Sequence, residues 1–409
     1  MHSSATESDA EALVEAAGPA HVATVSFLAA RAVPSAGFVV ALAGGTALAR
    51  VAYRRGWREG YGASIAAMVE TVAIMGPARF GVPLTQAISA PLLGRMEATG
   101  RHVAAQVAAA GAVRVLSNAI GFAFFVWVIA GGLDAYAGSY DRIVGLFGLE
   151  LGQGGTLAVS LAGLLFWGVM ASVVQVLVYR RGLERWPERA PDAEPPPAEA
   201  EVVPGRFDPR AAAVAAAIGF GLLLASTSWE LLGAVTGALA LAWSLSRPDV
   251  RALPTGLVLG AILALGAFAF SLGGGLGLDV ALRRALRAAL LVAVATWLRA
   301  AARPQGLREV GRRALARLAW IPAATQAGRV LEAIGAEGRI AAAGRSLRDR
   351  LRDGPRDTLE VVDAVLAWVA SEAGRFRSHP PRGPLLLRLG GGDLALLAVM
   401  AAPVLTLVG

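Results

Sequence analysis

The sequence predicts an all-α, polytopic helical membrane protein with about eight to nine transmembrane helices. Of its 409 residues, 56% are hydrophobic. Residues 151–179 and 252–278 contain no Asp, Glu, Lys or Arg, and each stretch exceeds the ~20 apolar residues that a helix needs to cross a bilayer. Arginines flank the apolar stretches, as they do at cytoplasmic helix ends. The net charge of +8 is therefore explained by arginines at the ends of helices in a cell (plasma or inner) membrane rather than by nucleic-acid binding.

The predicted organisation has two membrane halves. Between them lies a stretch rich in Pro, Glu and Asp, which is expected to be solvated and non-helical. The predicted segments are an N-terminal membrane domain (1–182), a cytoplasmic linker (183–210), a four-span membrane domain (211–300), cytoplasmic amphipathic helices (301–392) and a final span (393–409).

The N-terminal domain is expected to contain about three to four spans and one re-entrant segment. Pro77 and Pro83 predict a helix break, because proline lacks the amide hydrogen that a continuing helix needs. The arginines that follow the first span mark its cytoplasmic end. In order, the expected elements are a surface helix (8–31), a span (32–53), an apolar stretch (61–74), a break (76–83), a short re-entrant piece (84–93), a long helix (103–133), an acidic outer loop (131–141) and a returning span (155–179).

The second half is expected to begin with a helical hairpin of two short spans, which meet at Glu230. A glycine-rich outer turn at 273–275 separates the third span from the fourth. The expected spans are 211–229, 231–246, a third within 254–276, a fourth at 280–299 and a last one at 394–409.

Arginine-rich amphipathic helices are predicted before the final span. Within 299–377, arginine outnumbers Asp and Glu together, which favours the cytoplasm. Apolar residues recur there at helical spacing, which indicates helices that lie on anionic lipid or dock a partner protein. The two apolar series are Leu307, Val310, Ala314, Leu318 and Ile321, and then Leu359, Val362, Leu366 and Val369.

The second half resembles the T component of energy-coupling-factor transporters, the transmembrane subunit that couples a pair of ATPases to a substrate-binding membrane subunit. The resemblance rests on the Asp208-Pro209-Arg210 entry, the hairpin of short spans and the basic start of the fourth helix at 282–287. The long Arg-bearing segment and the single final span complete it. The first half, 1–186, is not part of that resemblance.

The resemblance implies that short motifs of Arg between small residues contact the ATPases. The matching positions here are Gly338-Arg339-Ile340 and Gly344-Arg345-Ser346. The first departs from the pattern, because Ile340 is not small. The implied ATPase-coupling residues are Arg339, Gly344, Arg345 and Ser346.

A second candidate site lies inside the membrane. Glu70 sits in the apolar run 65–74, where an ionisable residue costs ~2.5–3.5 kcal/mol and is usually paired or functional. Arg79 or Arg114 is expected to pair with it. The candidate substrate or proton site consists of Glu70, Arg79, Gln86, Arg114 and Asn118. The alternatives are a structural Glu–Arg pair or a helix in the interface. Gln175 is expected to serve hydrogen bonds between helices.

Catalytic chemistry is not expected in this chain. It has no cysteine and no lysine, and its four histidines are scattered, so we predict neither an enzyme nor a metal or cofactor site. The leading hypothesis is a membrane subunit of an ATP-driven uptake transporter. Two alternatives stay open: a membrane-organising scaffold without transport, and a secondary transporter that uses Glu70 as a proton or substrate site.

Overall fold

The computed structural model describes residues 3–31, 37–77, 82–187, 205–246, 253–334, 337–352, 357–376, 385 and 387–407. Every regular element in these residues is helical, which confirms the predicted all-α class. The elements are fifteen α-helices, the π-helix η2 (Phe125–Ala130) and the 3-10 helix η4 (Ala402–Leu407). Most of the predicted linker, 188–204, lies outside the described residues.

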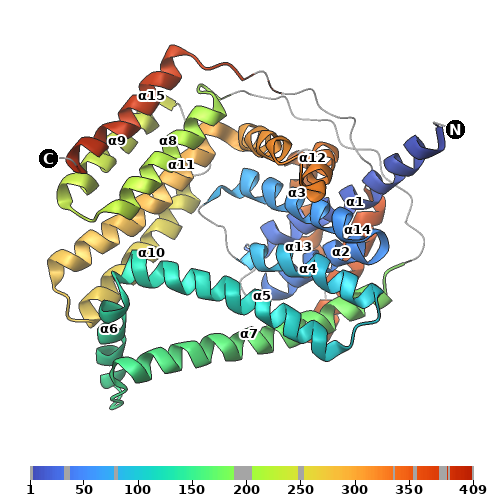
Figure 1. The fold of residues 1–409 in the computed structure, drawn as a ribbon, viewed down its shortest axis with the longest axis horizontal. Coiled ribbons are helices and arrows are strands. Elements are labelled where there is room, and N and C mark those ends of the chain that lie inside the picture. The colour runs from blue at the N-terminus through green and yellow to red at the C-terminus, as the bar shows by residue number, and fades with distance from the viewer. Residues whose placement is uncertain are drawn as a thin grey trace.

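Helices from both ends of the chain form a first bundle (Figure 1). Its core includes Leu48 near the N-terminal end of the chain together with Leu347 and Val369 from the predicted cytoplasmic segment. The Arg-rich helices therefore pack on the N-terminal helices and do not stand apart from them. The members of the first bundle are α1 (Ser3–Ala29), α2 (Gly37–Arg55), α3 (Trp57–Met75), α4 (Val82–Ala98), α12 (Pro322–Ala333), α13 (Glu337–Arg352) and α14 (Thr358–Arg375).

The expected surface helix at 8–31 is wrong. It corresponds to α1, which contacts five other helices of the first bundle, and Val22, Val25 and Phe27 on it are completely or almost completely buried. Its Ala- and Val-rich composition fits a helix surrounded by other helices as well as one on a surface.

An antiparallel pair of long helices runs between the two sides of the molecule (Figure 1). One is α5 (Val103–Phe124), which continues into η2, and the other is α7 (Gly152–Glu184). The acidic loop expected at 131–141 is wrong, because these residues enter the helix α6 (Leu133–Gly145). Asp134 lies in its first turn, where a carboxylate favours a helix. Asp141 accepts hydrogen bonds from the amides at the start of α7.

The second bundle contains the predicted hairpin and the C-terminal apolar helix. Leu223, Leu232, Trp297 and Leu396 lie in its core. Two consecutive helices, Pro209–Ala225 and Trp229–Ser246, stand where the hairpin of spans was predicted, although only the second is long and apolar enough to cross a membrane. The Asp208 side chain caps the first of them by accepting from the Arg210 amide at 2.8 Å. The members are α8 (Pro209–Ala225), α9 (Trp229–Ser246), α10 (Leu253–Gly273), α11 (Leu278–Arg317), α15 (Gly391–Ala401) and η4.

The helix α11 belongs to both bundles. It is 40 residues long and continues past the end at 299 that the sequence predicted. Trp297 on its first arm lies in the core of the second bundle, and Leu315 on its second arm lies in the core of the first. The two arms meet at a kink, where Arg303 has φ 58° and ψ 162° and is followed by Pro304.

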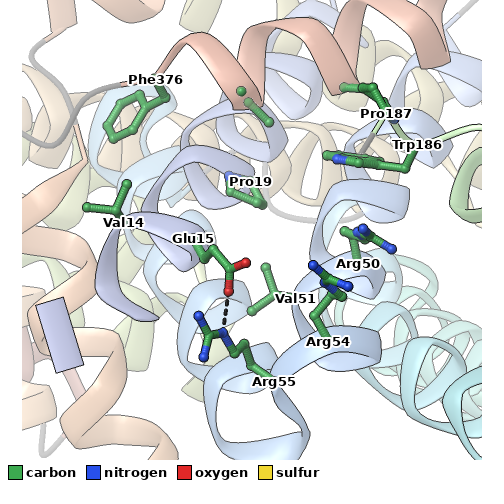
Figure 2. Close-up of a pocket in the computed structure, with 13 residues that line it drawn as sticks. Val14, Glu15, Pro19, Arg50, Val51, Arg54, Arg55, Trp186, Pro187 and Phe376 are labelled. Atoms are coloured by element: carbon green, nitrogen blue, oxygen red, sulfur yellow. Dashed lines mark hydrogen bonds and ion pairs between the residues drawn. The ribbon is translucent and has the colours of Figure 1, made fainter. Parts of the chain in front are cut away.

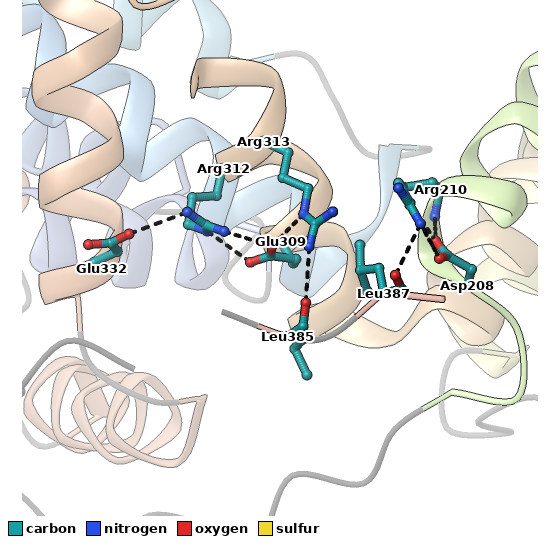
Figure 3. Close-up of polar contacts among 8 residues, drawn as sticks. All are labelled: Asp208, Arg210, Glu309, Arg312, Arg313, Glu332, Leu385 and Leu387. Atoms are coloured by element: carbon teal, nitrogen blue, oxygen red, sulfur yellow. Dashed lines mark hydrogen bonds and ion pairs between the residues drawn. The ribbon is translucent and has the colours of Figure 1, made fainter. Parts of the chain in front are cut away.

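Polar contacts secure the chain segment before α15 at the junction of the bundles (Figure 3). Arg313 of α11 donates hydrogen bonds to the Glu309 carboxylate (2.7 Å) and to the Leu385 carbonyl (3.1 Å). Arg210 of α8 donates to the Leu387 carbonyl at 3.3 Å. This segment is therefore held by guanidinium groups from both bundles.

Six helices in the described part of the chain are long and apolar enough to cross a membrane. The pattern indicates a multi-pass membrane protein, while the additional spans of the sequence prediction stay a prediction. The predicted first span corresponds to α2, which is mostly buried and is not one of the six. The six candidate spans are 12–29, 103–130, 152–184, 229–246, 253–273 and 278–317. Large exposed apolar side chains on α5, α7 and α10 include Leu116, Ile120, Leu161, Phe166, Leu257 and Ile262.

Candidate functional site

A buried polar cluster connects α4, α5 and α7. At its centre the Gln175 Oε1 atom accepts a hydrogen bond from Arg114 Nη2 at 2.8 Å. The Gln175 Nε2 atom donates to Gln86 Oε1 (2.9 Å) and Ser89 Oγ (2.7 Å). One turn further along α7, the Tyr179 hydroxyl donates to the same Gln86 oxygen at 2.7 Å. We call these five residues the Arg114 cluster.

The positions of these residues along their helices explain how they meet. Gln175 and Tyr179 are four residues apart and Gln86 and Ser89 are three apart, so each pair lies on one helix face. The close approach of α2 to α7 depends on Gly45, because a Cβ atom there would lie 1.8 Å from the Tyr179 hydroxyl oxygen. The Tyr179 hydroxyl can donate to Gln86 because Gly45 has no side chain that would occupy the same space.

Gly45→Ala is therefore expected to lower the free energy of unfolding by about 1–3 kcal/mol, because it displaces the buried Tyr179 hydroxyl from its acceptor. The matched control is Gly111→Ala, a buried helical glycine whose added Cβ would have space. Thermal unfolding of both purified variants in detergent measures the difference. Equal stability of the two variants would contradict the close contact between α2 and Tyr179.

The cluster has more hydrogen-bond donors than acceptors. The Arg114 side chain is buried, its Nε atom has no hydrogen-bond partner, and neither does Gln86 Nε2. The guanidinium carbon lies 5.8 Å from the centre of the Phe38 ring. In the described part of the chain, Arg114 forms no ion pair with Asp or Glu. The five N–H donors of a planar guanidinium suit a carboxylate or phosphate, so the free Nε donor of Arg114 is of the chemical type that binds anionic groups.

Glu70 does not belong to the Arg114 cluster. Its carboxylate oxygen lies 3.2 Å from Arg308 Nε on α11, and both side chains are largely buried. Arg308 also donates hydrogen bonds to the Leu331 and Ile334 carbonyls at the end of α12. The expected pairing of Glu70 with Arg114 is thus wrong, because the Glu70 carboxylate pairs with an arginine of α11 instead.

The described residues of the predicted intramembrane site therefore do not all lie together. Gln86 and Arg114 come together through Gln175. Asn118 is half-buried on α5, one turn beyond Arg114. Arg79 lies outside the described residues. The sequence interpretation left Ser89 and Tyr179 out of the site, although polar residues at helical spacing in apolar stretches could have indicated them. Gln175 makes the interhelical hydrogen bonds expected of it.

The four residues implied in ATPase coupling lie on α13. The Arg339 side chain is buried, with its guanidinium carbon 4.4 Å from the centre of the Phe376 ring. Arg345 is exposed, and Gly344 beside it is half-buried. Ser346 is exposed and its hydroxyl accepts a hydrogen bond from Trp368 Nε1 at 3.4 Å. Arg345 is thus accessible to a partner, whereas Arg339 faces the protein interior.

Among the described residues, no group of three or more His, Asp and Glu side chains gathers in a way that could hold a metal ion. Comparison of the chain with protein-family models, curated proteins and solved structures gives no match. Functional assignment therefore depends on the contacts within the molecule.

Proposed function

We propose that the chain is the integral membrane subunit of an ATP-driven uptake transporter, similar to energy-coupling-factor systems. It would link ATPase subunits to a substrate-facing membrane module. The observation that carries the proposal is the path of α11, which passes from the core of the second bundle into that of the first and is followed directly by α12–α14. A force on the Arg-rich helices would therefore reach both bundles.

The exposed side of α13 supports a docking role for this segment. Arg345, Arg348 and Arg350 are all exposed on it. Guanidinium groups present forks of donors that suit carboxylates or the free carbonyls at a helix end of a partner. The buried position of Arg339 favours Arg345 as the main contact with an ATPase subunit.

The connection from this segment to the Arg114 cluster runs through α14 and α7. Arg181 of α7 donates to both Asp363 oxygens of α14 at 2.6 and 2.7 Å, and Arg185 lies 2.8 Å from the same carboxylate. Hydrogen bonds from the Arg181 guanidinium lower the pKa of the Asp363 carboxyl to about 2, so this contact stays ionised at neutral pH. Because α7 also carries Gln175, movement of α14 would act on the helix that holds the Arg114 cluster.

Arg345→Glu is expected to abolish recovery of a paired ATPase when the tagged protein is purified from its native membrane in mild detergent. The reason is that a carboxylate would repel the acidic or carbonyl groups that a guanidinium attracts. Arg101→Glu is the charge-matched control, since Arg101 is exposed on the turn between α4 and α5. Mass spectrometry of the purified complexes identifies the partners. Recovery of the wild-type protein without any ATPase would overturn the proposed function.

A secondary transporter is the second candidate, favoured by the buried donors of the Arg114 cluster. Uptake into proteoliposomes that contain the purified chain alone, without ATP, would distinguish it from the first. The pairing of Glu70 with Arg308 favours Arg114 over Glu70 as the centre of such a site.

A further inference from the structure

An arginine-lined cavity of about 200 Å³ lies where α1, α2, α7 and α14 converge (Figure 2). Three arginines at the end of α2, Arg50, Arg54 and Arg55, form one side of it. Trp186 and Phe376, which follow the ends of α7 and α14, contribute aromatic walls. The cavity is separate from the Arg114 cluster and shares no residue with it.

The charges of this cavity are unbalanced. Arg55 forms an ion pair with Glu15, drawn as the dashed contact in Figure 2. Arg50 and Arg54 form no ion pair or hydrogen bond with another described residue. The Arg50 guanidinium lies 5.7 Å from the centre of the Tyr53 ring and 5.9 Å from the centre of the Trp186 ring, so two cation–π contacts position it. The half-buried Arg50 and the exposed Arg54 thus line the cavity without an ion pair, and the single carboxylate of the cavity, Glu15, acts on Arg50 as well as on Arg55.

The cavity lies beside the helix ends that the arginine pattern predicts to be cytoplasmic. Arg180 and Arg181 end α7 on the same side of the bundle at which the arginines end α2, and both positions match the cytoplasmic ends that the positive-inside pattern predicts. Trp186 is of the residue type that is enriched at lipid head groups. Basic pockets at this level attract anionic head groups.

We propose that this cavity binds the phosphate group of an anionic molecule, with Arg50 and Arg54 as the two guanidinium ligands and Trp186 as an apolar wall beside the bound group. Planar guanidinium forks match phosphate oxygens in pairs. Glu15 limits the positive charge of the cavity by occupying Arg55. The phosphate belongs either to an anionic phospholipid or to a soluble phosphate compound, and both would use the same ligands. This inference does not rest on the proposed function.

Native mass spectrometry of the full-length protein tests the proposal directly. Protein delipidated in detergent is incubated with phosphatidylglycerol or with phosphatidylcholine, and retained lipid is counted with and without inorganic phosphate. Preferential retention of phosphatidylglycerol that phosphate does not displace supports a lipid as the source. Retention that phosphate displaces, or direct phosphate binding, supports a soluble compound. Equal retention of both lipids together with no phosphate binding overturns the proposal.

Paired variants assign the binding to the cavity. Arg50→Gln/Arg54→Gln is expected to weaken binding by about tenfold or more, because two charge-assisted contacts are lost. Arg58→Gln/Arg101→Gln removes the same charge from exposed positions outside the cavity and should leave binding near the wild-type level. Glu15→Gln releases Arg55 and is expected to tighten binding, a gain that a purely structural Glu15–Arg55 pair would not produce. Unchanged binding in Arg50→Gln/Arg54→Gln overturns the proposal. If that variant folds poorly, Arg50→Lys/Arg54→Lys provides a second test. It keeps both charges and should retain part of the affinity.

Discussion

Replacing Arg308 by methionine is expected to lower the free energy of unfolding by about 3–5 kcal/mol, because the buried Glu70 carboxylate loses the guanidinium that lies 3.2 Å away. The same change removes the hydrogen bonds that Arg308 donates to the Leu331 and Ile334 carbonyls at the end of α12. Three helices, α3, α11 and α12, are therefore loosened together. Chemical unfolding of the purified protein in detergent, followed by tryptophan fluorescence, measures the effect.

Two controls separate the ion pair from a general effect of losing an arginine. Arg317→Met removes an exposed arginine from the same helix and should change stability by less than about 1 kcal/mol. Glu70→Gln/Arg308→Met removes both charges and should recover much of the lost stability, since the buried carboxylate is removed together with its guanidinium. Arg308→Met with wild-type stability would contradict a stabilising pair between α3 and α11.

Gln175→Leu is expected to have an effect of similar size, about 3–5 kcal/mol. The leucine fills a similar volume but offers no acceptor to Arg114 and no donor to Gln86 or Ser89. The Arg114 charge then lies buried with no hydrogen-bond acceptor from α7. Thermal unfolding in detergent measures this loss, and binding or uptake assays would show whether the cluster also holds a ligand.

The exposed Gln153 on the same helix provides the matched control, because Gln153→Leu makes the same chemical change outside the cluster. The double variant Arg114→Leu/Gln175→Leu should be more stable than Gln175→Leu, since it also removes the buried charge. If Gln175→Leu and Gln153→Leu unfold alike, Gln175 does not stabilise the Arg114 guanidinium.

Hydropathy and charge gaps predict the most apolar helices well. The charge-free stretches 151–179 and 252–278 become α7 and α10, whose exposed apolar side chains fit a lipid environment. The end of α3 at Met75, where the break was predicted to begin, and the consecutive helices α8 and α9 also agree with the sequence prediction. These features can be predicted from short stretches of sequence, because a helix that contacts lipid is apolar in its own composition.

Features that depend on neighbouring helices could not be predicted in the same way. The composition of α1 and α2 does not reveal whether lipid or protein surrounds them, since both surroundings are apolar. The partner of Glu70 lies on a helix from the other half of the chain, and no pattern within α3 indicates which arginine will reach it. In the Arg114 cluster, likewise, the spacing of the polar residues shows that they share one face of α4 or one face of α7, but it does not show that the two faces meet. Partner choice is a property of packing between helices.

At the kink of α11, one turn of α3 contacts α11 on both sides of the bend. The backbone conformation at Arg303 is sparsely populated for a residue with a side chain and costs on the order of 1–3 kcal/mol, while Pro304 has no amide hydrogen with which to bridge the bend. On either side of it, α3 holds the two arms, with the Ile74 carbonyl accepting from Arg299 at 2.6 Å and the Glu70 carboxylate facing Arg308. The fixed rise between those two points on α3 sets the angle between the arms, and hence the tilt of one bundle relative to the other.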